Sequence, residues 1–443
     1  MEMTLSTEAE AAFDLIEKTK TNVFITGKAG TGKSTLLEYM RIYAKKNIIV
    51  LAPTGVSAIN VNGETIHSFF KLKPGFEKEE AKKARIDDKK RRKYKRLTTI
   101  AIDEISMVRA DLLDAIDIFL RRARQDERPF GGVQMIFFGD LYQLPPVLTP
   151  ADRDIFFADY TAPYFFAADV FRGQKDLFGE GFEMKRIELS EIYRQNDSRF
   201  IDILNAVRDD AVTDRHLEVL NSRHDPYFVP PEDENYIHLM TTNRDARKIN
   251  MAELAKLDGS DQLFEATETG KVPRNLKPND PEITIKVGAQ VMFIQNDSER
   301  RWVNGTIGQV YDIQEFYNEE TQENEPVVTV AFPHGRMVEV KPHTWEISKY
   351  HYVDGEFERD VMGTYKQLPL RLAWAITIHK SQGKTFDKVV IDLGGGTFAH
   401  GQTYVALSRC TSLEGIVLKR PFTRRSIIMD DVVKWYGEGI SSK

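Results

Sequence analysis

Residues 27–34 read Gly-Lys-Ala-Gly-Thr-Gly-Lys-Ser, which is a complete G-x4-G-K-[ST] phosphate-binding loop. The apolar run at 22–26 precedes it and predicts a buried strand, while Leu36, Leu37 and Met40 follow at helical spacing. In this frame the glycines let backbone N–H groups converge on phosphate oxygens, and the new helix directs its positive end toward them. The sequence therefore predicts a nucleoside-triphosphate site rather than an ordinary glycine-rich turn.

The loop also predicts roles for individual side chains. Lys33 is expected to reach the β- and γ-phosphates, and Ser34 is expected to coordinate Mg²⁺. ATP and Mg²⁺ are therefore the predicted cofactors. The residues expected to bind the nucleotide in this segment are Gly27, Ala29, Gly30, Thr31, Gly32, Lys33, Ser34 and Thr35.

The length and composition are those of a multidomain globular protein. A chain of 443 residues is too long for one core and predicts two to four domains. Its one cysteine, Cys410, excludes an internal disulfide framework and a Cys-based zinc site. No apolar run approaches the roughly 20 residues that span a bilayer, and the polar start Met1–Leu5 is neither a secretory signal nor a transit peptide. A cytoplasmic, prokaryotic-type protein is expected.

The charge is unevenly distributed. A net charge of -6 argues against a basic coat, but it does not exclude a local basic groove. From Lys82 to Arg96, ten of fifteen residues are Lys or Arg. Such a run is a solvated helix face, a mobile loop or part of a nucleic-acid surface, and the composition does not choose among them.

The first part of the chain alternates strand and helix signals, and its strands are nearly continuous apolar runs. This pattern predicts a parallel sheet that is covered on both faces. The basic stretch 71–96 interrupts the pattern and is expected to be a small insertion. Strands are expected at 22–26, 47–52, 97–103 and 133–138, and helices at 33–44, 54–60 and 108–124.

A second α/β set is expected to start near Arg186, to stop near residue 280 and to resume at 371. Its expected elements are strand 187–189, helix 200–207, strand 236–240, helix 243–254, the segment 372–378, strand 389–393, helix 403–408 and strand 416–418. Between the halves, short runs separated by turn residues predict a small antiparallel barrel inserted into this domain. These runs are 287–294, 305–313, 326–332 and 337–340.

Polar side chains follow two of the buried strands of the first part. Asp103 is expected to hold Mg²⁺ directly or through water, and Glu104 to orient and deprotonate the attacking water. Gln143, which follows the strand ending at Phe138, has the length to contact a γ-phosphate or its attacking water. These three residues and Lys33 are the candidate catalytic groups of the first part.

Two arginines in the second part are candidates for an arginine finger. Arg194 and Arg409 stand at the ends of expected elements, and a finger is worth roughly 10³–10⁵ in rate. Spacing alone does not separate them from surface arginines.

Several motifs occur in a fixed order along the chain, and together they resemble those of the Pif family of superfamily 1B DNA helicases, relatives of the RecD-like enzymes. The resemblance covers nearly the whole chain, and Asp103–Val147 looks like the family's own signature segment. The motifs are GKAGTGKS (27–34), APTG (52–55), TIHSF (65–69), DEISM (103–107), GDLYQLPPV (139–147), YRQ (193–195), IHKSQG (378–383) and VALSR (405–409).

The resemblance implies an α/β fold with two RecA-like domains and the nucleotide between them. It implies domain 1A at 1–180 with a wedge insertion at about 68–96, domain 2A at 181–283 and 371–443, and an SH3-like barrel at 284–370. It also implies a monomer that uses ATP to move 5′→3′ on single-stranded DNA and to unwind duplex and often G-quadruplex DNA. Arg194 and Arg409 match the family's arginine fingers, Gln143 its γ-phosphate contact, and Gly383 a nucleotide contact.

The resemblance further implies a set of DNA contacts, because backbone phosphates need donors and bases need stacking partners. Phe69 and Phe70 are candidates for base stacking, and Trp302 is a weaker one, while a buried core role for one of the phenylalanines is the alternative. The candidate DNA-binding residues are Pro53, Thr54, Gly55, His67, Phe69, Asn243, Thr377, His379 and Lys380.

One departure from the family pattern concerns adenine recognition. The family carries a glutamine shortly after the first Leu-Ser, whereas here Leu5-Ser6-Thr7-Glu8 is followed by Ala9. Glu8, Glu10 and loose base recognition are the alternatives. A phosphate-loop remodelling ATPase or switch without a DNA track is the rival function, and a DNA clamp or nuclease subunit ranks below it because no further acidic or histidine cluster is present.

Overall fold

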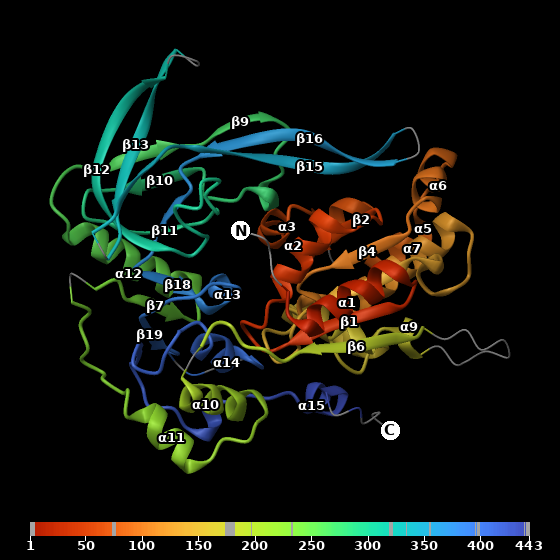
Figure 1. Cartoon of the computed structure of the whole chain (residues 1–443), viewed down its shortest axis with the longest axis horizontal. Coiled ribbons are helices and arrows are strands. Elements are labelled where there is room, and N and C mark those ends of the chain that lie inside the picture. The colour runs from red at the N-terminus through yellow and green to blue at the C-terminus, as the bar shows by residue number, and fades with distance from the viewer. Residues whose placement is uncertain are drawn as a thin grey trace. The chain divides into compact units, whose positions relative to one another are not determined.

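The computed structural model divides the chain into two compact units (Figure 1). The first comprises Met1–Tyr193, Ser348–Val361 and Ser442–Lys443, and the second comprises Arg194–Ile347 and Met362–Ser441. Met1–Thr4 and the expected domain boundary at 180/181 lie outside the described residues. The structure describes residues 5–72, 77–172, 182–195, 197–231, 234–318, 322–333, 335–353, 356–394, 396, 399–437 and 439.

The first unit is built on a six-stranded parallel sheet in the order β3-β2-β4-β5-β1-β6. Its central strands are buried along their whole length, which explains their continuous apolar runs. The predicted strands of this region are confirmed within one or two residues. The strands are β1 (Asn22–Gly27), β2 (Ile48–Ala52), β3 (Glu64–Thr65), β4 (Thr99–Ile102), β5 (Gln134–Phe138) and β6 (Met184–Leu189).

The helices of this unit cover the sheet. Ile16 of α1 and Leu36 and Met40 of α2 pack with Val23 and Ile25 of β1 in one core. This core holds the strand and the helix that flank the phosphate loop. The helices are α1 (Thr7–Lys18), α2 (Lys33–Tyr43), α3 (Gly55–Asn60), α4 (Ile66–Phe70), α7 (Ala110–Arg124), α8 (Pro150–Asp159) and α9 (Asp169–Arg172).

The prediction that strand 187–189 opens the second α/β set is wrong. β6 pairs in parallel with β1 along its whole length, from Asn22 opposite Met184 to Gly27 opposite Leu189, and so ends the first sheet. Most of its residues keep some exposure, as expected of an edge strand. The short apolar pattern identified a strand, but the pattern carries no information about which sheet the strand joins.

The basic stretch forms two helices, α5 (Glu77–Lys83) and α6 (Asp88–Lys95), which lie beside α7 (Figure 1); residues 73–76 of it are outside the described part. Tyr94 is buried, and its hydroxyl donates to the carbonyl oxygen of Phe69 at 2.9 Å. Its ring contacts those of Phe70 and Phe119. The run is therefore a helical insertion that is attached to the first unit by aromatic packing.

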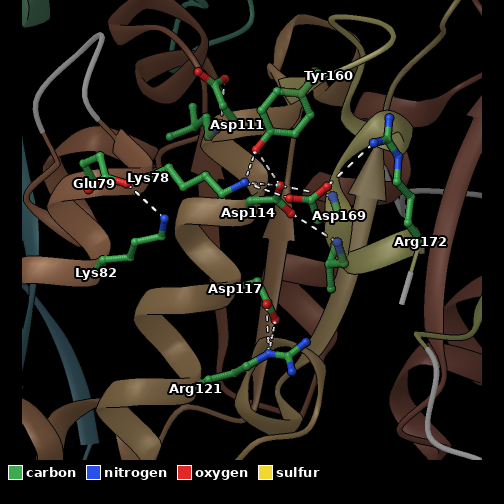
Figure 2. A network of polar contacts seen from close by, with 12 residues as sticks. Lys78, Glu79, Lys82, Asp111, Asp114, Asp117, Arg121, Tyr160, Asp169 and Arg172 are labelled. Atoms are coloured by element: carbon green, nitrogen blue, oxygen red, sulfur yellow. Dashed lines mark hydrogen bonds and ion pairs between the residues drawn. The ribbon is translucent and has the colours of Figure 1, made fainter. Parts of the chain in front are cut away.

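A buried carboxylate also fastens this insertion (Figure 2). Asp114 of α7 accepts hydrogen bonds from the Tyr160 hydroxyl at 2.6 Å and from the amides of Asp169 and Val170, both at 3.1 Å. The Lys78 ammonium of α5 lies 3.7 Å from Asp114 and 2.7 Å from Asp169. Burial raises the pKa of Asp114 while these donors oppose that shift, so the carboxylate depends on its partners.

Replacing Asp114 by alanine is expected to destabilise the first unit strongly. The substitution leaves the Tyr160 hydroxyl and two backbone amides without their acceptor and removes one of the two carboxylates near the Lys78 ammonium, at a cost of about 3–5 kcal/mol. The thermal midpoint should fall by about 10 °C. The exposed pair Asp14–Lys18 supplies the control, since Asp14→Ala should change the midpoint little. Equal midpoints for the two variants in calorimetry would contradict the anchoring role.

The second unit contains a four-stranded parallel sheet in the order β18-β7-β19-β20. Its strands are β7 (Ile237–Met240), β18 (Ala375–Thr377), β19 (Val389–Asp392) and β20 (Ile416–Leu418). Its helices are α10 (Ser198–Arg208), α11 (Asp214–Asn221), α12 (Asn243–Lys256), α13 (Ile378–Ser381), α14 (Gln402–Leu407) and α15 (Asp431–Gly437). The predicted α/β elements between 200 and 254 and between 389 and 418 are confirmed.

The β-rich segment is antiparallel, as predicted, but it is longer than the expected 284–370. A five-stranded sheet runs β14-β13-β12-β11-β17, a two-stranded sheet pairs β10 with β8, and a third sheet joins β15, β16 and β9. The strands are β8 (Gln262–Glu265), β9 (Thr267–Gly270), β10 (Glu282–Ile285), β11 (Gln290–Phe293), β12 (Ile307–Asn318), β13 (Glu323–Ala331), β14 (Met337–Val340), β15 (His343–Val353), β16 (Glu356–Gln367) and β17 (Leu370–Leu372).

The extra length has a packing reason. Phe264 of β8 and Ile285 of β10 share a core with Val291 of β11, so the β-rich segment begins at Gln262. At the other end, Leu372 belongs to the antiparallel β17 instead of the returning α/β pattern. The polar residues of β8 and β9 hid these strands from the sequence pattern. In the described part of the chain, no helix is long and apolar enough to cross a membrane.

Candidate functional site

The phosphate loop has the backbone geometry that its glycines predict. Gly30 and Gly32 adopt φ of 83° and 84°, in the left-handed region. A Cβ on Gly27 would lie 2.6 Å from the carbonyl oxygen of Leu189 and 2.6 Å from Thr31 Oγ1. α2 begins at Lys33, and Gly32 as its N-cap provides no side-chain acceptor. The first amides of α2 are therefore available to an anion.

Lys33 folds back onto the loop that carries it. Its Nζ donates to the carbonyl oxygen of Gly27 at 2.8 Å and to that of Lys28 at 2.9 Å. Phosphate oxygens would replace these neutral acceptors with charged ones, and charge-assisted hydrogen bonds are the stronger kind. The Ser34 hydroxyl lies at the exposed start of the same helix, beside Thr35.

The two predicted carboxylates follow β4. Burial raises the pKa of Asp103 to about 6, and the nearby Lys33 charge opposes the shift, which places the two side chains in one electrostatic environment. A divalent cation would therefore compete with a proton at Asp103 near pH 6. Glu104 has φ 50° and ψ 45°, a left-handed backbone that is uncommon for a residue with a side chain. Such strain is frequent at functional sites.

The donor set fits Mg²⁺ supplied together with a nucleotide. Within the described ranges, no group of three or more His, Cys, Asp or Glu side chains could hold a metal alone. Mg²⁺ is typically bound through one or two protein oxygens together with substrate phosphates and water. The Asp103 carboxylate and the Ser34 hydroxyl are hard oxygen ligands of that kind.

Gln143 is held in place by a residue that sequence reasoning missed. Its Nε2 donates to Asp140 Oδ2 at 3.2 Å, and its backbone amide donates to the carbonyl oxygen of Asp140 at 3.0 Å. Both residues are buried. Asp140 therefore orients the amide that is expected to face a γ-phosphate. The signal was present in the sequence, because Gly139-Asp140 directly follows the apolar run of β5.

Residues 193–195 cross the boundary between the two units. The Tyr193 amide donates to the carbonyl oxygen of Gly30 at 2.9 Å, inside the first unit. The Gln195 Nε2 donates to the carbonyl oxygens of Ser408 at 3.2 Å and Cys410 at 3.1 Å, inside the second. Arg194 is the residue between Tyr193 and Gln195 in the sequence. Its side chain is half-buried, and burial lowers its pKa. Its Nη1 donates to the Ser408 carbonyl oxygen at 3.3 Å.

Arg409, the second residue expected to act as an arginine finger, is buried in this structure. Its side chain is 1% exposed, and its guanidinium donates within the second unit to the carbonyl oxygens of Val405 at 2.9 Å and Lys384 at 3.1 Å and to Ser408 Oγ at 2.8 Å. In this structure it ties α14 to the loop after α13. A position at an element's end suggested a free cation, because the sequence does not reveal which carbonyl oxygens lie nearby.

Replacing Arg409 by alanine is therefore expected to reduce folding stability as well as turnover. The deletion leaves a cavity and several buried acceptors without a donor, and each such group costs about 1–3 kcal/mol. Thermal unfolding should show a midpoint several degrees lower. A variant with an unchanged midpoint and a large drop in kcat would instead support a pure finger role.

The first-unit candidates for DNA contact lie on two short helices. Thr54 is the N-cap of α3, where its Oγ1 accepts from the Ser57 amide at 3.1 Å, between the half-buried Pro53 and the buried Gly55. His67 is half-buried on α4. The Thr54 hydroxyl therefore already accepts one hydrogen bond as a helix cap. Thr54 and His67 follow the carboxyl ends of β2 and β3, which is where the sequence placed them.

The stacking role of Phe69 is not supported. Phe69 and Phe70 are each 1% exposed, and the Phe69 ring contacts those of Phe70, Tyr94 and Tyr350. Trp302 is buried against Phe293. None of the three offers a free ring face to a base in this structure. Their apolar side chains were needed for packing, which is the alternative that the sequence left open.

The second-unit candidates cluster at helix starts. Asn243 is exposed at the first turn of α12, and Thr377 caps α13 by accepting from the Lys380 amide at 3.3 Å. Burial lowers the pKa values of His379 and Lys380. Gly383 is exposed with φ 78°, and a Cβ there would meet open space.

The glutamate proposed for adenine recognition has another partner. Glu8 accepts from the Ser190 amide at 2.7 Å and from its hydroxyl at 2.6 Å, which lowers the Glu8 pKa. This ties α1 to the segment after β6. In this structure Glu8 therefore has a structural role, and Glu10 is exposed on the same helix.

The chain is similar to helicases of known sequence and structure. A family model described as PIF1-like helicase matches residues 4–217. The ATP-dependent DNA helicase Pif1 of Bdellovibrio bacteriovorus is 35% identical over 443 residues, covering 98% of this chain and 91% of that protein. A crystal structure of Bacteroides sp Pif1 with ADP-AlF4 is 38% identical with a TM-score of 0.87, covering 99% of this chain and 97% of that one. A Bacteroides Pif1 structure with ADP-AlF3 and single-stranded DNA is also 38% identical, with a TM-score of 0.67 and coverage of 99% and 97%.

Proposed function

Because this chain belongs to the PIF1-like helicase family and is an ATP-hydrolysing DNA helicase, we propose that it moves 5′→3′ along single-stranded DNA and unwinds duplex and G-quadruplex DNA as a monomer. The observation that carries this proposal is the phosphate loop, whose Lys33 charge acts on the buried Asp103 carboxylate that follows β4. The rival function of a phosphate-loop switch without a DNA track is set aside by family membership.

The proposal includes a domain assignment. The two parallel sheets are the RecA-like domains, the antiparallel segment from Gln262 to Leu372 is the SH3-like insertion, and α5 with α6 forms the wedge insertion. Attachment of α5 and α6 through Tyr94 and Asp114 supports the last point, since a wedge must be rigid to separate strands.

The residue roles follow the chemistry of phosphoryl transfer. Lys33 and the loop amides bind the phosphates, Ser34 and Asp103 hold Mg²⁺, and Glu104 takes the proton of the attacking water. When held by these oxygens, Mg²⁺ would neutralise part of the triphosphate charge. Gln143 and Arg194 contact the γ-phosphate, so its loss changes the affinity of the two units for DNA and lets the strand advance.

A strand-displacement assay tests the proposed direction. Duplexes with a 5′ tail or a 3′ tail of equal length are mixed with the protein, ATP and Mg²⁺, and the released strand is measured. The 5′-tailed duplex should be unwound and the 3′-tailed duplex should not, while Lys33→Ala releases neither. Preference for the 3′ tail would overturn the polarity. A folded quadruplex behind a 5′ tail extends the same assay to that substrate.

A further inference from the structure

The turn that follows the predicted general base packs tightly against the segment that follows β5. Ile105–Met107 form a single helical turn directly after Glu104. A Cβ on Gly139 would lie 2.9 Å from Ile105 Cγ2 and 3.2 Å from the Ser106 backbone nitrogen. The two segments therefore meet with no space for a side chain at Gly139, and a shift of one displaces the other.

Each of these segments carries one residue of the predicted hydrolysis chemistry. Glu104 precedes the turn, and Gln143 follows Gly139 along the second segment. The Gly139 amide donates to the carbonyl oxygen of Ile25 at 3.1 Å, near the end of the strand that leads into the phosphate loop. Asp140 holds Gln143 through both its carboxylate and its carbonyl oxygen. The contact at Gly139 thus joins the predicted general base to the residue that is expected to contact the γ-phosphate.

Ser106 has a buried hydroxyl without a hydrogen-bond partner. The residue is 1% exposed, and within the described residues its Oγ finds neither a donor nor an acceptor. An unpaired buried hydroxyl costs folding stability, and alanine at this position would avoid that cost. The hydroxyl is accounted for if it gains a partner in another state of the site.

We propose that Ser106 is a positioning residue for ATP hydrolysis, whose hydroxyl gains an acceptor on the 139–143 segment when Gln143 contacts a γ-phosphate. The Asp140 carboxylate and the backbone carbonyl oxygens are the acceptors that this segment offers. The new hydrogen bond holds the turn, and with it the left-handed backbone of Glu104, while the attacking water loses its proton. The inference rests on the proposed roles of Glu104 and Gln143 and adds the link between them.

Ser106→Ala tests the inference because it separates stability from turnover. The thermal midpoint should be unchanged or about 2–4 °C higher, since an unpaired hydroxyl is removed. The kcat for oligo-dT-stimulated ATP hydrolysis should fall about tenfold, which is the effect of one hydrogen bond made only in the hydrolysing state. The KM for ATP and the affinity for oligo-dT should not change. Ser106→Cys, which keeps the size but donates weakly, should lose turnover to a similar extent.

Ser348→Ala is the matched control. The Ser348 Oγ, on β15, is likewise buried without a partner in the described part of the chain. The thermal midpoint of this variant should therefore respond as that of Ser106→Ala does, while its kcat should equal that of the wild type. An equal fall in kcat for the two variants would overturn the positioning role of Ser106.

A double-mutant cycle with Gln143→Ala tests the link between the two segments. If the Ser106 hydroxyl acts through the 139–143 segment, Ser106→Ala should lower kcat by less than about twofold in the Gln143→Ala background. Losses that multiply independently would overturn the inference.

The remaining outcomes are also distinct. A lower midpoint for Ser106→Ala would show a structural hydroxyl, and a raised KM for ATP would assign Ser106 to nucleotide binding; either result overturns the inference. If kcat is unchanged in Ser106→Ala while the wild type hydrolyses ATP with oligo-dT and Lys33→Ala does not, the inference fails and the proposed function stands. If the wild type shows no DNA-stimulated hydrolysis, the proposed function itself fails.

Discussion

Replacing Arg194 by alanine should lower kcat for DNA-stimulated ATP hydrolysis by about 10³-fold, with a smaller change in the KM for ATP. Arg194 is half-buried, and within the described residues its guanidinium donates one hydrogen bond, to the Ser408 carbonyl oxygen at 3.3 Å. A desolvated cation with few partners has electrostatic interaction energy available for a transferring phosphoryl group. Steady-state ATPase assays with saturating oligo-dT measure the effect.

The control for Arg194→Ala is Arg424→Ala, which removes an exposed arginine paired with Asp214 in the same unit. This control should leave kcat unchanged. Thermal midpoints should be close to that of the wild type for both variants, in contrast to Arg409→Ala. A kcat for Arg194→Ala within threefold of the wild type would exclude the finger role and leave Arg194 as a structural residue.

Replacing Glu104 by glutamine should reduce the single-turnover rate of ATP hydrolysis by about 10²–10⁴-fold and abolish unwinding. The amide keeps the size of the side chain but cannot accept the proton of the attacking water. Because Lys33 and the loop amides are untouched, ATP binding should persist. The affinity for oligo-dT should also persist, since Glu104 is absent from the proposed DNA contacts.

Glu38→Gln, on the exposed face of α2, is the matched control and should hydrolyse ATP at the wild-type rate. Rapid-quench measurements of γ-phosphate release distinguish the chemical step from binding. If Glu104→Gln retains more than a tenth of the wild-type rate, the general base is another residue. If it loses oligo-dT binding, the substitution has disturbed the left-handed backbone at this position and not the chemistry alone.

The parallel sheets were predictable because their strands are buried on both faces and so read as continuous apolar runs. Runs such as Ile48–Ala52 and Gln134–Phe138 have that character. The polar strands β8, β9, β15 and β16 were not recognised, since exposed residues dominate strands that keep one or both faces in water. The sheet joined by β6 also depended on tertiary pairing that three apolar residues cannot specify.

The residues of the candidate site likewise fall into a group that the sequence predicts and a group that it does not. Local chemistry identified the phosphate loop and Asp103-Glu104, because their roles depend on adjacent backbone. The burial of Phe69 and Arg409 was not predictable, since their partners come from distant segments such as Tyr94 and Lys384. The signature residue Asp114 also proved to be a structural anchor. Tertiary contacts of this kind are not encoded in spacing.

The junction at residues 193–195 has a mechanical consequence. The Tyr193 amide is fixed to the nucleotide-binding loop and the Gln195 side chain to the second unit, so a single residue, Arg194, separates two fastened points. A displacement of the Gly30 carbonyl by an incoming triphosphate must then pass directly into the backbone torsions of Arg194. Inserting one glycine after Tyr193 should leave the hydrogen bonds of Tyr193 and Gln195 in place. The insertion should nevertheless weaken the coupling between nucleotide binding and movement along DNA.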